Sequence, residues 1–226
     1  MSAPREAPAG FGAAPAAPLP AAFFARDTVT VARELLGKTI ASHASGVLTS
    51  GVIVETEAYL GAHDPGSHAA TRGITTRNRV MYGPPGCAYV YFTYGNHHML
   101  NLVTEAEGTA GAVLVRAIEP TQGLEVMSAR RAGRTGPELT NGPGKVAAAL
   151  GIDLTHNGVI LGHELTVYDA PAAPDAEVGI SGRVGLTDGH ELPLRFYVRG
   201  NPYVSKGRTG PRPPKRRPDL RAEETA

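Results

Sequence analysis

The sequence predicts a single domain of the mixed α/β (α+β) class with a mainly antiparallel β-sheet. The chain has 226 residues, of which 42% are hydrophobic, so it is long enough to bury one core. Short strand-like segments alternate with glycine and proline, which is typical of strands joined by turns. The clearest such signal is a strand–turn–strand pattern between residues 88 and 103.

Composition excludes several classes of protein. The single cysteine, Cys87, rules out an internal disulfide and a cysteine-based zinc site, and it favours a cytoplasmic location, at the nucleoid in a bacterium. No run of roughly 18 apolar residues is present, so we expect no membrane partner. Residues 1–20 are rich in alanine and proline and residues 207–226 are basic, so we expect disordered tails around a domain at 21–206.

The first elements follow from local signals. Asp27 can cap a helix that runs to about Leu36, since glycine follows as a stop. Two strands are expected next, at Thr39–Ser42 and Val47–Glu55. Residues 61–73 contain proline and glycine turns and at most a short helix, so we expect a loop that can carry a site.

A hairpin is predicted in the middle of the chain. Residues 75–79 should form a short helical turn, and the sequence GPPG then breaks the chain before strands at 88–93 and 97–103. A two-residue turn would pair Val90 with Asn101. A three-residue loop pairs Tyr89 with Asn101, places Tyr91 on that same face and leaves Tyr94 at the tip, and we favour this register.

The remaining elements are a strand, two helices and three short strands. The helix at 143–150 begins with proline and is followed by glycine, which is the usual asymmetry of helix ends. The full set is a strand at 111–118 containing Arg116, a helix from about 123 to 131, the helix at 143–150, and strands at 159–167, 177–184 and 194–198.

Two carboxylates at the end of the second strand are the first candidates for chemistry. Glu57 precedes an aromatic residue, and a partly buried carboxylate there would have the raised basicity of a general base. Alternatively, Glu55 and Glu57 both face solvent on an alternating strand. Since the two share a face, at least one of them should matter less for chemistry.

Other polar and aromatic residues have competing interpretations. His63, Asp64 and His68, with His97 and His98, could ligate a metal, but they match no recognised ligand spacing, so we expect no metal and no cofactor. The NGPGK sequence at 141–145 is either an anion-contacting helix start or plain capping. Hairpin tyrosines are usually core or cross-strand pairs, whereas Tyr94 at the turn is a plausible exposed wedge.

At these residues the chain resembles the alkyladenine (3-methyladenine) DNA glycosylases of the mammalian type. The resemblance covers about Arg26 to Ser205, with a histidine eleven residues after the second glutamate and an asparagine at 101. Its motifs are ARELLGK (32–38), VETEAYLG (54–61), TRNR (76–79), YVYFTYG (89–95), VRAIEP (115–120), NGPGK (141–145) and LRFYVRGNPYVS (194–205).

The resemblance implies a role for each matching residue. Glu57 matches the general base that activates water against the sugar C1′, and Arg116 matches a residue that helps to place that water and contacts DNA. Tyr94 matches the wedge that fills the vacated base stack. The walls of the base pocket match Tyr59, His68, Tyr91 and Asn101. We assign further DNA contact to Arg77 and Arg79, where positive charge gathers, and to Lys145, at the helix start that can contact an anion.

The resemblance also implies a curved sheet, a roll or partly open barrel, with a DNA-intercalating hairpin. The activity expected is that of a monomeric, monofunctional hydrolase in base excision repair, which flips alkylated or deaminated purines from double-stranded DNA and hydrolyses the N-glycosidic bond. No lysine lies in residues 54–101, so an imine-forming lyase lacks a nucleophile there. The alternatives are a non-catalytic nucleic-acid-binding module with an aromatic hairpin and a metal-dependent hydrolase.

Overall fold

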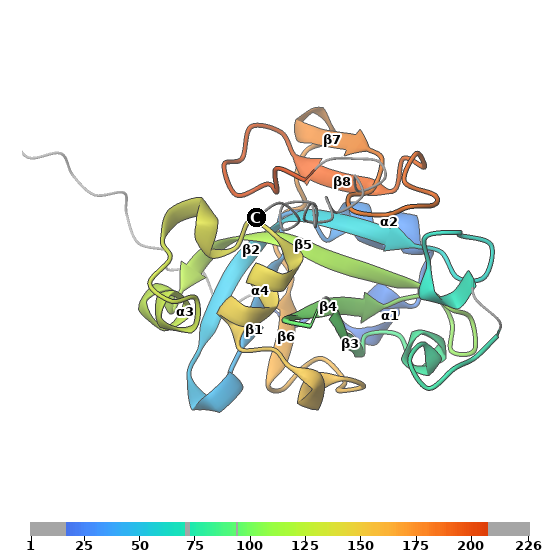
Figure 1. Ribbon diagram of the computed structural model, residues 1–226, viewed down its shortest axis with the longest axis horizontal. Coiled ribbons are helices and arrows are strands. Elements are labelled where there is room, and N and C mark those ends of the chain that lie inside the picture. Colours follow the sequence, from blue (N-terminus) through green and yellow to red (C-terminus); the bar gives the residue numbers. More distant parts are fainter. Residues whose placement is uncertain (1–16, 71–72, 94, 208–226) are drawn as a thin grey trace, which may run out of the picture.

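A curled antiparallel sheet organises the molecule. Figure 1 shows the computed structural model, which describes residues 17–70, 73–93 and 95–207. The sheet has eight strands in the order β3-β4-β5-β2-β1-β6, and β8 joins it through β2 and carries β7. The strands are β1 (Thr39–Ser42), β2 (Thr49–Tyr59), β3 (Ala88–Thr93), β4 (His97–Val103), β5 (Ala112–Gln122), β6 (Leu165–Tyr168), β7 (Val178–Ser181) and β8 (Arg195–Val198).

Four short α-helices accompany the sheet in the described part of the chain: α1 (Ala21–Phe24), α2 (Thr28–Glu34), α3 (Leu124–Arg130) and α4 (Pro143–Leu150). The connecting segments of the described chain contain short 3₁₀ helices: η1 (Ala44–Gly46), η2 (His68–Ala70), η3 (Arg79–Tyr82), η4 (Gly136–Leu139), η5 (Leu154–His156) and η6 (Asp175–Glu177). This half-barrel confirms the predicted mixed α/β domain with a curved, antiparallel sheet.

Strand β2 is the centre of the sheet because it changes partner along its length. Its first half pairs with β1, from Thr49 to Val52, and its second half pairs with β8, from Glu55 to Glu57. On its other edge it pairs with β5 throughout, with register shifts on both sides of Glu55. Such bulges bend a strand and redirect its side chains, and they place the two glutamates where the sheet curls.

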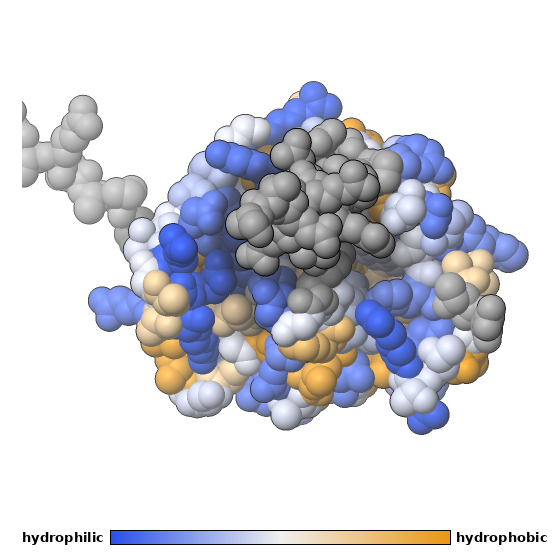
Figure 2. Space-filling view, viewed as in Figure 1, coloured by the Kyte–Doolittle hydropathy of each residue, from blue (hydrophilic) through white to orange (hydrophobic). Residues whose placement is uncertain are grey.

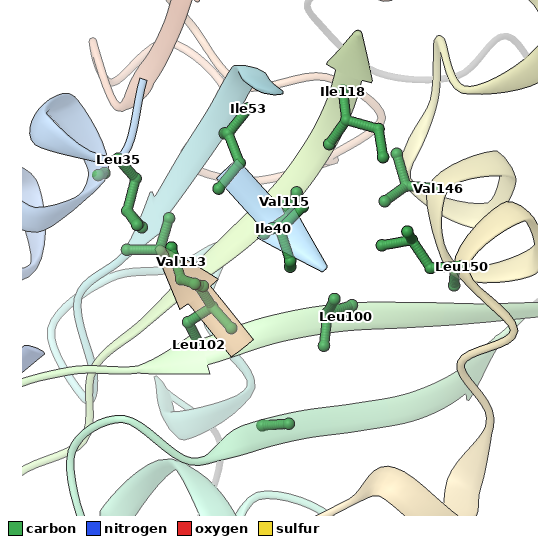
Figure 3. Close-up of a cluster of buried hydrophobic side chains, with 14 of the residues drawn as sticks. Leu35, Ile40, Ile53, Leu100, Leu102, Val113, Val115, Ile118, Val146 and Leu150 are labelled. Carbon is green, nitrogen blue, oxygen red and sulfur yellow. The ribbon is translucent and has the colours of Figure 1, made fainter. Parts of the chain in front are cut away.

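The core lies between the sheet and the helices that cover it. Figure 3 shows leucine and valine side chains of α4 pointing toward isoleucine and leucine residues of the central strands. Leu35, at the end of α2, packs into the same cluster. All of the labelled side chains are 0% exposed, so they form part of the close-packed core: Leu35, Ile40, Ile53, Leu100, Leu102, Val113, Val115, Ile118, Val146 and Leu150.

Helix ends follow the predicted capping signals. The side chain of Asp27 accepts a hydrogen bond from the backbone N–H of Thr30 at the start of α2. Pro143 occupies the first turn of α4, and Gly151 ends that helix with a φ of 74°, a left-handed conformation that favours glycine. The predicted bounds of α4 are therefore confirmed.

Several predicted boundaries differ from the structure, among them the end of β5, which runs to Gln122 beyond the predicted 118, and the end of β7, which lies at Ser181 before the predicted 184. Strand β2 extends four residues beyond Glu55 to Tyr59, because buried partners satisfy its two glutamates. The strand expected at 159–167 begins only at Leu165, and a turn precedes it. Within the segment 1–20, which was expected to be a tail, Leu19 donates a backbone hydrogen bond to Val167 on β6 and so is part of the fold; residues 1–16 and 208–226 lie outside the described chain.

The surface is mixed in character. On the coloured part of the face in Figure 2, hydrophobic residues form separate spots among hydrophilic ones. Among the described helices, none combines the length and apolar composition required to cross a bilayer.

Candidate active site

The β3–β4 hairpin supplies one wall of the site. Tyr89 lies opposite Asn101 and Tyr91 lies opposite Met99, so the predicted three-residue register is confirmed. Alternation along the strand turns Tyr89 and Tyr91 to the same face. Tyr94, the predicted wedge, lies outside the described residues.

This face of the hairpin opens onto a pocket of about 280 Å³. All of the predicted base-binding residues and Arg116 line it, which brings together residues from β2, the loop after it, the hairpin and β5. The complete lining is Tyr59, Gly66, His68, Met81, Tyr89, Tyr91, Thr93, Met99, Asn101, Leu114, Arg116, Pro143, Val184, Gly185 and Leu186. An aromatic pocket with a few convergent polar groups is a typical ligand site.

The aromatic side of the pocket is a packed group of three rings. The rings of His68 and Tyr91 meet edge to face with centroids 4.6 Å apart, and Tyr89 lies 5.4 Å from Tyr91. The hydroxyl of Tyr89 is 2.9 Å from Nδ1 of His68. Burial, with a smaller effect from the charge of Arg77, lowers the pKa of His68 to about 4, so the imidazole is neutral at neutral pH.

This neutral imidazole makes stability depend on pH. A histidine in the unfolded chain titrates near pH 6.5. Between about pH 6.5 and 4, His68 is therefore protonated in the unfolded chain and neutral in the folded chain. The contribution of His68 to the free energy of unfolding falls as the pH falls through this range. For His68→Gln, the fall between about pH 7 and 5 should be smaller by about 1–2 kcal/mol. Urea unfolding of the wild type and of His68→Gln at both pH values measures this difference. If the free energy of unfolding fell equally in the two proteins, a neutral His68 would be contradicted.

Asn101 is fixed by backbone carbonyls at the floor of the pocket. It is 3% exposed, and its Nδ2 donates to the carbonyl of Tyr89 at 3.1 Å. A second, longer contact joins Nδ2 to the carbonyl of Met99 at 3.5 Å. The amide nitrogen is thus committed to the hairpin, which makes Oδ1 the polar atom that Asn101 can offer to a ligand.

A β-bulge on β5 places Arg116 beside the two glutamates. Ala117 lies opposite Glu55 and Val115 lies opposite Thr56, so Arg116 is the extra residue between two ladder pairs. Bulges of this kind redirect side chains near functional sites. Arg116 is 5% exposed and points to the pocket face, from which it reaches both carboxylates.

Glu57 lies fully buried directly behind the pocket wall. Its Oε2 accepts hydrogen bonds from the hydroxyl of Tyr59 at 2.9 Å and from Nη1 of Arg116 at 3.2 Å. Its Oε1 accepts from the backbone N–H of Val184 at 2.7 Å. Burial and the nearby charge of Glu57 raise the pKa of Tyr59 well above its usual range, so this phenol remains a proton donor to the carboxylate.

Glu55 is equally buried, but its carboxylate accepts hydrogen bonds from two arginines. Its Oε1 accepts from Nε of Arg116 at 2.9 Å and from Nε of Arg195 at 2.7 Å. Ser205 donates its backbone N–H and its hydroxyl to the same carboxylate, at 2.7 and 2.8 Å. Burial alone would raise the pKa of Glu55, but the two arginines and the Ser205 amide outweigh it, and the pKa lies below its usual value.

Both glutamates are 0% exposed, so the alternative that they face solvent is wrong. The expectation that one of them matters less for chemistry is consistent with their different neighbours. Glu57 is bonded by residues that line the pocket, whereas Glu55 mainly balances the charge of Arg116 and Arg195.

The three cations predicted to contact DNA differ in their neighbours within the chain. Arg77 is exposed, and its guanidinium carbon is 5.1 Å from the ring centroid of Tyr91. Arg79 is exposed at the start of η3. Lys145 instead contacts Glu138 at 2.8 Å and Asn141 at 2.7 Å within the chain, so it must leave these partners to reach a phosphate.

The histidine–aspartate candidates for a metal are not gathered in one place. Both carboxylate oxygens of Asp64 accept hydrogen bonds from Arg183, and His68 packs against the hairpin tyrosines. Within the described ranges, no group of three histidine, cysteine, aspartate or glutamate residues is placed to hold a metal ion.

Comparison with known proteins shows the family to which this sequence is similar. The family model described as "Methylpurine-DNA glycosylase (MPG)" matches residues 22–202. The chain belongs to the methylpurine-DNA glycosylase family. A relative from Chlorobaculum parvum is 47% identical over 207 residues, which cover 91% of this chain and 98% of the relative. A relative from Methanoculleus marisnigri is 50% identical over 192 residues, which cover 83% of this chain and 98% of the relative.

Both relatives carry the name "Putative 3-methyladenine DNA glycosylase". They come from a bacterium and an archaeon, so the comparisons support the methylpurine-DNA glycosylase family without supporting its mammalian branch.

Sequence reasoning missed several residues of this methylpurine-DNA glycosylase site. Arg195 and Ser205 lie within a recognised motif, but their contact with Glu55 spans 140 and 150 residues and has no local signal. Arg183 and Val184 fall at the end of the strand predicted at 177–184, but β7 ends at Ser181, and no local pattern marked either residue as part of a site. An arginine between apolar residues, as Arg195 is, was the one available signal of a buried ion pair.

Proposed function

We propose that the protein is a monofunctional DNA glycosylase of base excision repair. It acts as a cytoplasmic monomer on double-stranded DNA, flips an alkylated or deaminated purine of the 3-methyladenine type out of the duplex, and hydrolyses its N-glycosidic bond. The observation that carries the proposal is the buried carboxylate of Glu57, because its three hydrogen-bond donors, Tyr59, Arg116 and Val184, all line the aromatic pocket.

The hydrogen bonds of Glu57 leave an acceptor position on Oε1 to which a water molecule can donate. Each carboxylate oxygen has two lone pairs, and Oε1 accepts one bond, from Val184. A water at the remaining position gives its proton to Glu57 while its oxygen bonds to C1′. The C1′–N bond breaks, and its electron pair leaves with the base. The charge of Glu57 also stabilises the oxocarbenium-like transition state.

The pocket walls suit a flipped purine. Tyr59, His68 and Tyr91 offer ring surfaces, and stacking is favourable for a base alkylated at N3 or N7, which carries positive charge. Such a base departs as a neutral molecule, so it needs no proton from the protein. The Oδ1 atom of Asn101 is placed to accept a hydrogen bond from a base edge and so to discriminate between purines.

Base release from defined duplexes tests this function. Duplexes carrying 3-methyladenine, 7-methylguanine, hypoxanthine or ethenoadenine are incubated with the protein, and the free base is quantified by chromatography. Release of at least one damaged purine with an intact abasic strand is expected. Tight binding without release of any of them would instead favour a non-catalytic nucleic-acid-binding module.

Tyr94 is proposed as the residue that fills the gap left by the flipped nucleotide. Refilling the stack with an aromatic ring offsets part of an unstacking cost of a few kcal/mol. Tyr94→Ser should therefore weaken binding and excision on duplex lesions with little change in melting temperature, whereas Tyr91→Ser damages the pocket. Fluorescence of 2-aminopurine beside the lesion reports flipping. Unchanged flipping in Tyr94→Ser, or a melt as damaged as that of Tyr91→Ser, would assign Tyr94 to packing.

A further inference from the structure

We propose that Arg183, held by Asp64, is a positioning residue that fixes the pocket wall relative to the general base, Glu57. This inference rests on the proposed function. Arg183 lies in the segment after β7 and is 0% exposed, which makes it the largest fully buried side chain of the described chain. It does not line the pocket, but Gly66, Val184 and Gly185 around it do.

The guanidinium of Arg183 joins three separate segments. Nη1 donates to the carbonyl of Ala58 on β2 at 2.9 Å and to Oδ2 of Asp64 at 2.6 Å. Nη2 donates to Oδ1 of Asp64 at 2.5 Å and to the carbonyl of Gly189 at 3.0 Å. This two-pronged pairing fixes the plane of the guanidinium, which a lysine ammonium cannot do.

Asp64 extends the same connection into the loop after β2. Its carboxylate also accepts the backbone N–H groups of Leu60 at 3.0 Å and Gly66 at 2.9 Å. Asp64 is 1% exposed; burial would raise its pKa, but Arg183 and these amides lower it below its usual value, so the pair remains charged. Loop 60–66, which leads to His68, is thereby tied to Arg183.

Arg183 is linked to Glu57 through two neighbouring residues, Tyr59 and Val184. Its guanidinium carbon is 4.7 Å from the ring centroid of Tyr59, whose hydroxyl donates to Oε2 of Glu57. The backbone N–H of the next residue, Val184, donates to Oε1 of Glu57. One arginine therefore sets both the orientation of an aromatic wall and the position of an amide on the opposite oxygen of the carboxylate.

Close approach at a glycine shows how tightly this arginine is enclosed. A Cβ atom on Gly66 would lie 2.6 Å from Nη2 of Arg183 and 2.7 Å from a methyl carbon of Leu186. Nε of Arg183 has no hydrogen-bond partner among the described residues, so its two terminal nitrogens and the Tyr59 ring hold the side chain. A different side chain cannot reproduce this set of contacts in the same space.

The test replaces Arg183 with lysine, which keeps the charge and loses the planar pairing. We expect the single-turnover rate constant for base release to fall about 10- to 100-fold, while the dissociation constant for lesion duplex changes less than about threefold. Asp64→Asn, which keeps the shape of the side chain, should lower the rate constant in the same direction. A purely structural role would lower the fraction of active protein and leave the rate constant unchanged.

Arg130→Lys is the matched control. Arg130 also donates to two backbone carbonyls, of Ala44 at 2.9 Å and Ala149 at 3.1 Å, and it also lies against a glycine, Gly151. It joins α3, α4 and η1 and is not among the pocket residues. Its variant should lose melting temperature and retain the wild-type rate constant.

Amide hydrogen exchange of the free protein gives a readout that does not need activity. Arg183→Lys should speed exchange of the Val184 N–H, which bonds Glu57, and leave the Val90 N–H, which bonds Asn157, unchanged. An unchanged rate constant for base release, or unchanged exchange at Val184, overturns the positioning role. If the wild type releases no base, the proposed function fails, and the exchange result still decides whether Arg183 positions Val184.

Discussion

Glu57→Gln should lower the single-turnover rate constant for base release by roughly 10² or more, since general-base catalysis contributes on that order. The amide retains the shape of the side chain but cannot take a proton from water. Tyr59 and Arg116, which bond the carboxylate, remain in the pocket wall, so affinity for lesion duplex should change little. Rapid-quench assays with excess enzyme measure the rate constant, and fluorescence anisotropy measures the affinity.

Glu119→Gln is the control for this variant. Glu119 is an exposed residue of β5 that accepts a hydrogen bond from Asn201, so losing its charge should leave excision unchanged. Near-normal base release by Glu57→Gln would assign water activation to another group. Loss of duplex binding together with excision would instead mean that the substitution damages the pocket.

The second large effect concerns stability. Glu55→Gln should lower the free energy of unfolding by about 3–5 kcal/mol, because Arg116 and Arg195 then lie buried without their shared carboxylate. Excision should fall as well, since Arg116 loses the bond that orients its Nε. Urea unfolding at neutral pH measures the first effect. Because the pKa of Glu55 is lowered by folding, its contribution is present above about pH 4.5 and is lost as pH falls further.

An exposed carboxylate provides the comparison for Glu55. Glu34 pairs with Arg26 at 2.7 Å, but both side chains are over a third exposed, and such pairs contribute about 1 kcal/mol at most. Glu34→Gln should therefore change stability little. Similar losses in Glu34→Gln and Glu55→Gln would show that the buried network adds no more than a surface ion pair.

The hairpin and helix α4 could be predicted from the sequence because each depends on residues close together in the chain. The hairpin bounds and register follow from a strand pattern on each side of one turn, and α4 follows from its proline start and glycine end. The pocket residues Tyr59, His68, Tyr91 and Asn101 follow from the family resemblance and have no local signal of their own. The structure brings these four residues to one cavity.

The buried charges could not be predicted in this way. Strand β2 was expected to end at Glu55 because two glutamates usually mark a solvated strand end. The structure buries them because arginines distant in sequence supply the opposite charge, and one of these, Arg116, is turned inward by a bulge with no sequence signature. Arg183 was missed for the same reason, since its partner Asp64 is 119 residues away.

The contact between Ser205 and Glu55 has a consequence for protein synthesis. The two residues are 150 positions apart, so at 5–20 residues per second a ribosome needs about 8–30 s to make the chain between them. During that interval β2 and β5 can pair, but Glu55 has neither Arg195 nor Ser205. We expect a nascent chain that stops before Ser205 to lack part of the Glu55 network and to be both inactive and prone to degradation, so that base excision requires synthesis past Ser205.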